Sequence, residues 1–280
     1  MQTYVTAIGG DAGSGTNSAI GLTALAGPCN ALSSSSFVMV NELATVAAEY
    51  ALARFIDSTT GGNVGASLTN VAGLANAVNA VTGSKGNNGM LVTSYLPSGG
   101  TASNTGVAAP FLAGIESTCS EASPDVNCDG LERLDTLANI IASCINTSGP
   151  SSSACTTPFT KTGVSSSETM LAVAHAIATR PTSNVAAIYL LQGASATAPY
   201  QPNLTSQPAD FTLALNFNNT NTSGANFNGP GGVAVDASGN VWVTNYGGNS
   251  VSELIGLATP VKTPLVACLK ATPPKAVCSP

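Results

Sequence analysis

The feature that most constrains the fold of this chain is a change in its hydrophobic period. Over residues 229–254, GPGGVAVDASGNVWVTNYGGNSVSEL, β-branched residues alternate with small or polar ones, and turn sequences such as DASGN separate the runs. A period of two predicts short antiparallel strands. We expect four of them, over residues 211–217, 232–236, 240–246 and 250–255.

Residues 19–200 instead carry apolar side chains every three or four positions, which is the period of a helix. The clearest segment is LERLDTLANIIASCI, whose apolar stripe carries Cys144 inward. Asn41 is placed to cap the first helix. We expect a bundle of about five helices, over residues 41–56, 68–81, 131–145, 165–181 and 183–193.

The N-terminal residues QTYVTAI, at positions 2–8, alternate and include β-branched and aromatic side chains, which predicts a strand. A single strand is not stable alone, so we expect it to join a sheet elsewhere in the chain or in another molecule. The predicted fold class is therefore α+β: a helical bundle with a small antiparallel β element at the C-terminus and an isolated N-terminal strand. The predicted boundaries separate a strand and loop, a disulfide-linked helical domain, and a β element with a Pro-rich tail, at 1–18, 19–200 and 201–280.

Charged side chains make up only 8% of the 280 residues, against about 25% in ordinary soluble domains. Solubility then depends on hydroxyl and amide groups, which salt does not screen, and such a surface suits life outside a cell. Eight basic residues spread along the chain make no nucleic-acid footprint. No apolar run reaches about 18 residues, so we expect no membrane span.

The seven cysteines form three close pairs with one left over, Cys29. The sequence has no C-x-x-C motif, and its one histidine is far from every cysteine, which favours disulfides over a metal site. Disulfides predict an oxidising compartment, and an odd thiol predicts a partner in another chain or in a segment outside this sequence. The predicted pairs are Cys119 with Cys128, Cys144 with Cys155, and Cys268 with Cys278.

The first residues, MQTYVTAIGG, have neither the basic region nor the apolar region of a signal peptide. The cysteines nevertheless predict an extracellular or cell-surface protein, and in that case we expect Met1 to stand in place of a removed leader or upstream domain.

The motif GVAVDASGNVWVTN, at 232–245, resembles the NHL repeat and its relatives in virginiamycin B lyase-like propellers. The helical region is similar to a segment of unknown function that precedes NHL repeats in some secreted bacterial proteins. A closed propeller needs roughly four to eight blades of about 40 to 45 residues, and residues 211–280 have room for one blade and a tail. The lyase or lactonase activity of propellers, which depends on a central channel, therefore does not carry over with the repeat alone. We interpret the matched residues Asp236, Asn240, Trp242 and Asn245 as structural.

The segment SPDVNCDGLERLD contains D-x-N-x-D-G, the start of an EF-hand-like calcium loop. Its ligands would be Asp125, Asn127, Asp129 and, one place early for the final carboxylate, Asp135. The alternative is a turn that caps the following helix, since Asp and Asn favour both turns and helix starts. Both interpretations stay open, and calcium is the only cofactor that the sequence predicts.

His175 is the only imidazole, and we expect it on the solvated flank of its helix. No G-x-S-x-G, S-x-x-K or H-E-x-x-H motif is present. We therefore expect a secreted structural or binding protein whose unpaired β edges bind a second copy or another extracellular protein. The alternative is a calcium-dependent extracellular hydrolase of the lactonase or esterase type, related to propeller lactonases. Carbohydrate binding by Trp242 and Tyr246 is a third possibility, which rests on two aromatic residues alone.

Overall fold

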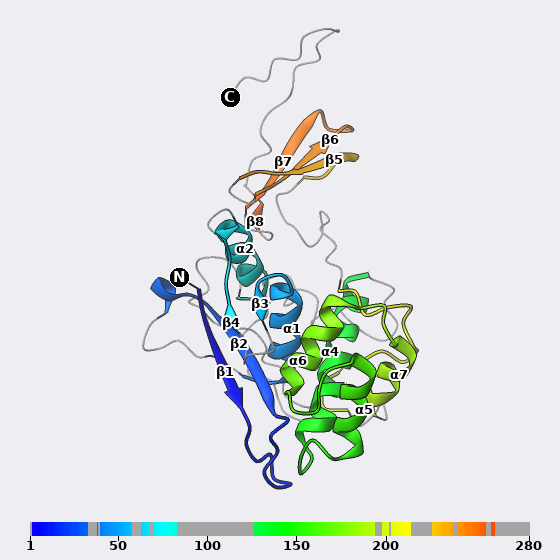
Figure 1. The fold of residues 1–280 in the computed structure, drawn as a ribbon. Helices are drawn as coiled ribbons and strands as arrows, with labels where there is room; N and C mark the ends of the chain where they lie inside the picture. The colour runs from blue at the N-terminus through cyan, green and yellow to red at the C-terminus, as the bar shows by residue number, and fades with distance from the viewer. Residues whose placement is uncertain are drawn as a thin grey trace, which may run out of the picture.

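The protein has an α+β fold, as predicted, with a helical body and a separate small β-sheet (Figure 1). The computed structural model describes residues 2–32, 38, 40–57, 63–67, 70–82, 126–193, 198–201, 203–213, 226–237, 240–255 and 259–260. Within these ranges the α-helices are α1 (Glu42–Leu52), α2 (Val71–Thr82), α4 (Val126–Ile145), α5 (Ser153–Thr162), α6 (Met170–Thr179) and α7 (Val185–Tyr189). The strands are β1 (Gln2–Ile8), β2 (Gly21–Pro28), β3 (Ile56–Asp57), β4 (Asn63–Val64), β5 (Pro230–Val235), β6 (Val241–Asn245), β7 (Ser250–Ile255) and β8 (Thr259–Pro260).

The N-terminal strand is not isolated, so that part of the prediction is wrong. β1 pairs antiparallel with β2, from Gln2 opposite Pro28 to Ile8 opposite Gly21. β2 is buried along most of its length and packs against α1, α2 and α6. The sequence GLTALAGP does not alternate because both faces of β2 are covered, which is why periodicity assigned it to the helical region. The hairpin therefore crosses the predicted boundary at residue 18.

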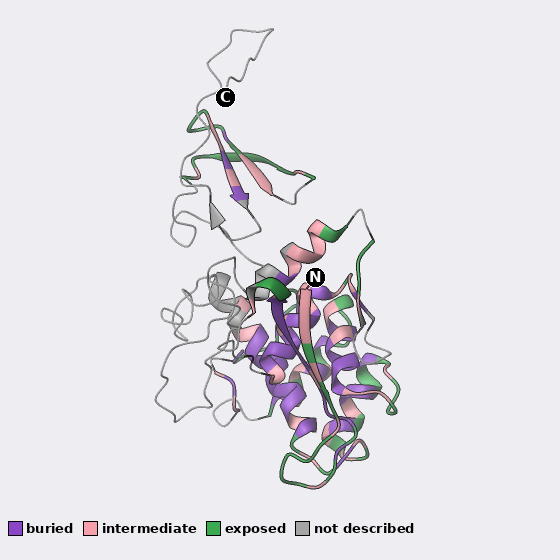
Figure 2. Ribbon diagram, turned by 90° about the vertical axis from the view of Figure 1, so that its left-hand side faces the viewer, coloured by how far each residue is buried: buried purple, intermediate pink, exposed green. Residues whose placement is uncertain are grey.

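Two clusters of buried apolar side chains form the core of the helical body (Figure 2). The larger cluster surrounds α4 and includes side chains of α5, α6 and α7. The smaller cluster lies between β2, α1 and α2. Asn41 caps α1 as predicted, since its Oδ1 accepts from the Ala44 amide at 2.8 Å. The predicted stripe of α4 is buried at Leu134, Leu137, Ile140, Ile141 and Cys144.

Helix α5 was not predicted, because its sequence SACTTPFTKT is rich in poor helix formers. Tertiary contacts fix it instead. The disulfide between Cys144 and Cys155 joins it to α4, and Phe159 is buried in the larger core cluster. Gly163 ends the helix in the left-handed region, with φ of 73°.

The helical body extends past its predicted end at residue 200. The Asn139 side chain donates to the Tyr200 carbonyl and accepts from the Tyr200 amide, both at 2.9 Å. Phe211 is fully buried, and its carbonyl accepts from the Tyr50 hydroxyl at 2.7 Å. The predicted strand over 211–217 is therefore wrong at residues 211–213, which belong to the core of the body; its remainder lies outside the described residues.

The C-terminal sheet, which we call the blade, comprises β5 to β8 in sequential antiparallel order. It stands apart from the helical body in both views (Figures 1 and 2). Three of its strands coincide closely with predicted ones, and the two-residue β8 completes the sheet. In the part of the chain that is described, no helix is both long enough and apolar enough to cross a membrane.

Candidate functional site

Among the described strands, β5 forms an edge of the blade, and it is exposed at every position. Figure 2 colours this strand as exposed along its length. Val233 is 71% exposed and Val235 is 67% exposed. The strand has no charged residue, whereas edge strands are commonly protected by lysine or by inward-pointing charges. Pro230 and the register shift between Pro230 and Gly232 protect the start of β5, so the segment Val233–Val235 is the part that is open to another strand.

The pairing of β5 with β6 fixes the direction of each amide. The Asp236 amide donates to the Asn240 carbonyl at 3.0 Å, and Ala234 lies opposite Trp242 in the same ladder. Hydrogen-bonded pairs alternate along an antiparallel ladder, so the Ala234 peptide groups also face β6. The N–H and C=O groups of Val233 and Val235 consequently point toward the free edge.

The side chains of these two valines lie on one face of the sheet, together with Val241 and Val243 of β6. Val233 is opposite Val243, and Val235 is opposite Val241. We call these four residues the valine face. Val241 and Val243 are half-buried, whereas the β5 pair is mostly exposed. The apolar surface is thus concentrated at the free edge.

A hydrogen-bonded turn holds β5 and β6 together. Asp236 accepts from the Asn240 amide, from the Asn240 side chain and from the Trp242 indole, each at 3.0 Å.

At the other end of β6, Asn245 joins the strand to its neighbours. Asn245 is buried, accepts from the Asn228 amide at 3.1 Å and donates to Ser252 Oγ of β7 at 2.8 Å. The structural interpretation of Asp236, Asn240, Trp242 and Asn245 is confirmed.

These strands and turns are those of a known repeat. Residues 227–254 match the family model of the NHL repeat. The match covers a single repeat, about one tenth of the 280-residue chain. No curated protein and no solved structure matched the chain.

The helical body contains a buried carboxylate–imidazole pair that the sequence did not predict. Glu49 of α1 is fully buried, and its Oε2 lies 3.0 Å from Nδ1 of His175 on α6. The His175 side chain is 22% exposed. The prediction of a solvated surface histidine is therefore wrong. A glutamate in an alanine-rich helix is usually a surface residue. Glu49, however, lies three residues after Val46 and three before Leu52, on the buried face of α1. That spacing is the sequence feature that could have indicated its burial.

Burial raises the pKa of Glu49, because the apolar surroundings disfavour its charged form. The hydrogen bond and the charge of His175 act in the opposite direction. Among the described residues, Glu49 Oε1 has no hydrogen-bond partner. Among the described residues, the hydrogen-bond partner of the imidazole ring is the Glu49 carboxylate.

Two of the four predicted calcium ligands, Asn127 and Asp129, lie at the start of α4. This helix begins at Val126, five residues before its predicted start, so Asn127 and Asp129 have a helical backbone rather than a loop backbone. Asp125 and the side chains of Asn127 and Asp129 lie outside the described residues, and Asp135 is fully buried. Among the described residues, no group of three acidic, histidine or cysteine side chains is arranged to hold a metal ion. The calcium site stays a prediction.

One predicted disulfide lies within the described residues, and it is confirmed. Cys144 and Cys155 are bonded and both fully buried. Cys29 is a free, exposed thiol at the end of β2. The predicted pairs Cys119–Cys128 and Cys268–Cys278 lie outside the residues whose side chains are described.

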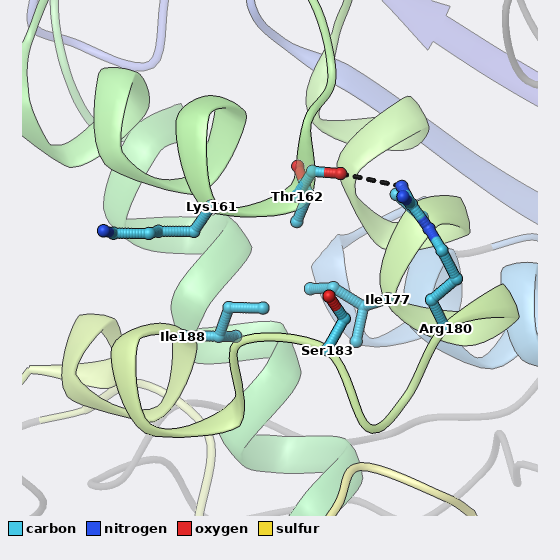
Figure 3. Close-up of a pocket in the computed structure, with 7 residues that line it drawn as sticks. Lys161, Thr162, Ile177, Arg180, Ser183 and Ile188 are labelled. Carbon is cyan, nitrogen blue, oxygen red and sulfur yellow. Dashed lines mark hydrogen bonds between the residues drawn. The ribbon is translucent and has the colours of Figure 1, made fainter.

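A small recess between α5, α6 and α7 carries two basic side chains but is not a ligand site (Figure 3). Its free volume of about 10 Å³ fits about one water molecule. The Arg180 guanidinium donates to the Thr162 carbonyl at 2.7 Å, and Lys161 extends away from the recess in Figure 3. These contacts are structural.

Proposed function

We propose that the protein is an extracellular structural or binding protein that associates with a second copy of itself through β5. The observation that carries this proposal is the free edge of β5, where the exposed amides and side chains of Val233 and Val235 lie together. An exposed edge without charges favours strand addition.

The alternation of the amides allows a specific pairing. Two β5 strands related by a twofold axis at Ala234 would place Val233 of each copy opposite Val235 of the other. Each such pair exchanges two hydrogen bonds, because both residues direct their amides to the free edge. Opposite residues lie on the same face, so the valine faces of the two blades would join into one apolar strip.

Strand β1 is a second edge, but it is a poorer template than β5. Both strands have a register shift, β1 between Thr3 and Tyr4 and β5 between Pro230 and Gly232. Several residues of β1 are half-buried, whereas β5 is exposed at every position and its segment Val233–Val235 lies beyond the shift. We therefore assign the association to the blade.

An extracellular location is supported by two observations. The Cys144–Cys155 disulfide fits an oxidising compartment, where such bonds persist. Only 8% of the residues are charged, so hydroxyl and amide groups provide most of the polar surface.

The test is the molar mass of the purified protein in solution, measured by sedimentation over a range of concentrations. Val235→Pro removes an outward amide without removing a β5–β6 bond, and proline is tolerated on edge strands. Val235→Lys places a charge on the same edge, and Ala237→Lys adds the same charge in the exposed turn as a matched control. We expect the wild type and Ala237→Lys to be dimeric, and both Val235 variants to be monomeric. A monomeric wild type would overturn the proposal.

The hydrolase alternative has a separate test. A screen of esters and lactones, with and without a calcium chelator, would detect such an activity, and His175→Ala and Asp125→Ala should abolish it. No hydrolysis by the wild type would exclude this alternative.

A further inference from the structure

The opposite face of the blade has an open hollow beside the turn between β6 and β7. Its volume is about 340 Å³, which lies in the range of small-ligand sites. Its lining includes Thr244, Tyr246, Asn249, Ser250 and Val251, and none of the described residues that line it is charged.

Tyr246 is the most exposed of the large apolar and aromatic side chains in the described residues, at 89%. Its backbone is nevertheless held firmly. The Tyr246 amide donates to the Gly229 carbonyl at 2.9 Å, and the next amide, of Gly247, donates to the Asn228 carbonyl at 3.0 Å. Gly248 closes the turn by donating to the Asn245 carbonyl at 3.2 Å. The backbone that carries this exposed ring is therefore held in place, which reduces the loop-ordering entropy lost when a ligand binds.

Polar groups suitable for a ligand lie next to this ring. Asn249, at the tip of the turn, adopts a left-handed conformation with φ of 47° and is exposed. Within the described residues, the Asn249 amide and the Ser250 hydroxyl form no side-chain hydrogen bonds. The Thr244 hydroxyl has only a long contact of 3.4 Å, to the Gly232 carbonyl. The hollow thus combines an aromatic face with neutral donors and acceptors.

We propose that this hollow binds a neutral carbohydrate chain. The C–H groups of a sugar ring carry slight positive charge and would lie against the negative face of the Tyr246 ring. Its hydroxyl groups would bond to Asn249, Ser250 and Thr244, which can both donate and accept. An anionic chain gains nothing from a lining without a basic residue, and the protein itself has a net charge of -6.

This proposal does not depend on self-association. The hollow lies on the face opposite the valine face, since Thr244 and Tyr246 alternate with Val243 and Asn245 along the chain. The monomeric variant Val235→Pro should therefore bind the same carbohydrates with the same intrinsic affinity, which separates failure of one proposal from failure of the other.

The experiment is affinity electrophoresis in gels that contain a soluble neutral polysaccharide, namely a β-glucan, a galactomannan or starch, with alginate as an anionic comparison. Sedimentation with insoluble cellulose and chitin extends the panel. We expect the wild type and Val235→Pro to bind at least one neutral polysaccharide and not alginate. Tyr246→Ala should weaken binding roughly tenfold, as expected for the loss of one aromatic contact.

Two variants make the test specific. Tyr246→Phe keeps the ring and should keep most of the affinity, and Asn249→Gly keeps the left-handed turn while removing the amide, so it should weaken binding. The proposal is overturned if the wild type binds none of the neutral polysaccharides, or if Tyr246→Ala binds as well as the wild type. Binding to immobilised casein instead would identify a peptide site and also overturn it.

Discussion

The buried pair of Glu49 and His175 makes a strong prediction about stability. Replacing His175 with alanine leaves the fully buried Glu49 carboxyl without its hydrogen-bond partner. A buried hydrogen-bonding group that loses its partner costs about 1 to 3 kcal/mol, and a carboxyl lies at the upper end, so we expect a loss of about 3 kcal/mol at pH 7.5. In the Glu49→Gln background no buried carboxyl remains, so the same change should cost about 1 kcal/mol.

The pH dependence gives the sign of the effect. Because burial raises the pKa of Glu49 in the folded state, an unfolded glutamate releases its proton first as the pH rises. The contribution of Glu49 to stability is therefore full below the ordinary glutamate pKa and is lost as the pH rises through the raised value. His175 lowers the Glu49 pKa, so His175→Ala should extend this loss to higher pH.

The wild type, His175→Ala, Glu49→Gln and the double variant form a double-mutant cycle. Urea unfolding at pH 4 and pH 7.5 measures the free energy of unfolding of each protein. We expect a coupling of roughly 2 kcal/mol between the two sites at pH 7.5 and a smaller one at pH 4. Glu168→Gln, a change to a carboxylate that is not fully buried, serves as the control and should leave the pH dependence unaltered. Equal losses from His175→Ala in both backgrounds at pH 7.5, or a loss independent of pH, would refute the reasoning.

Three further predictions concern other parts of the body. Replacing both Cys144 and Cys155 with alanine should lower the free energy of unfolding by about 3 kcal/mol, because the bond closes a loop with a sequence separation of 11; unchanged urea unfolding would contradict this. Gly21→Ala should cost about 1 to 3 kcal/mol, since an added Cβ would lie 2.5 Å from Thr169 Cβ, and an unaltered Tm would contradict it. The calcium interpretation predicts that calcium raises Tm in the wild type but not in Asp129→Ala, whereas the helix-capping interpretation predicts no rise in either protein.

The sequence predicts those elements whose pattern is visible in neighbouring residues. α4 has a regular apolar stripe on one side, and the blade strands are separated by turn residues such as Asp236 and Asn240, so both are visible as patterns. β2 and α5 depend on distant contacts instead. β2 lacks alternation because helices and β1 enclose it, and α5 is held by a disulfide and by Phe159 despite its poor propensity.

The same distinction between local pattern and distant contact applies to the candidate sites. The role of the NHL-matched residues follows from turn chemistry and is confirmed in the structure. The Glu49–His175 pair joins residues 126 positions apart, and no local pattern indicates such a contact. The sequence predicts that a single blade has unpaired edges, but it does not predict which strand forms them, because the expected strand at 211–217 precedes β5. The position of β5 at an edge and the direction of its amides required the register.

The most direct test of the proposed association is the molar mass of the wild type and of Val235→Pro, measured by sedimentation over the same range of concentrations. The free edge of β5 predicts a dimer that dissociates on dilution for the wild type and a monomer throughout for the variant. A wild type that stays monomeric at the highest concentration, or a Val235→Pro variant that dimerises as well as the wild type, would contradict association through β5.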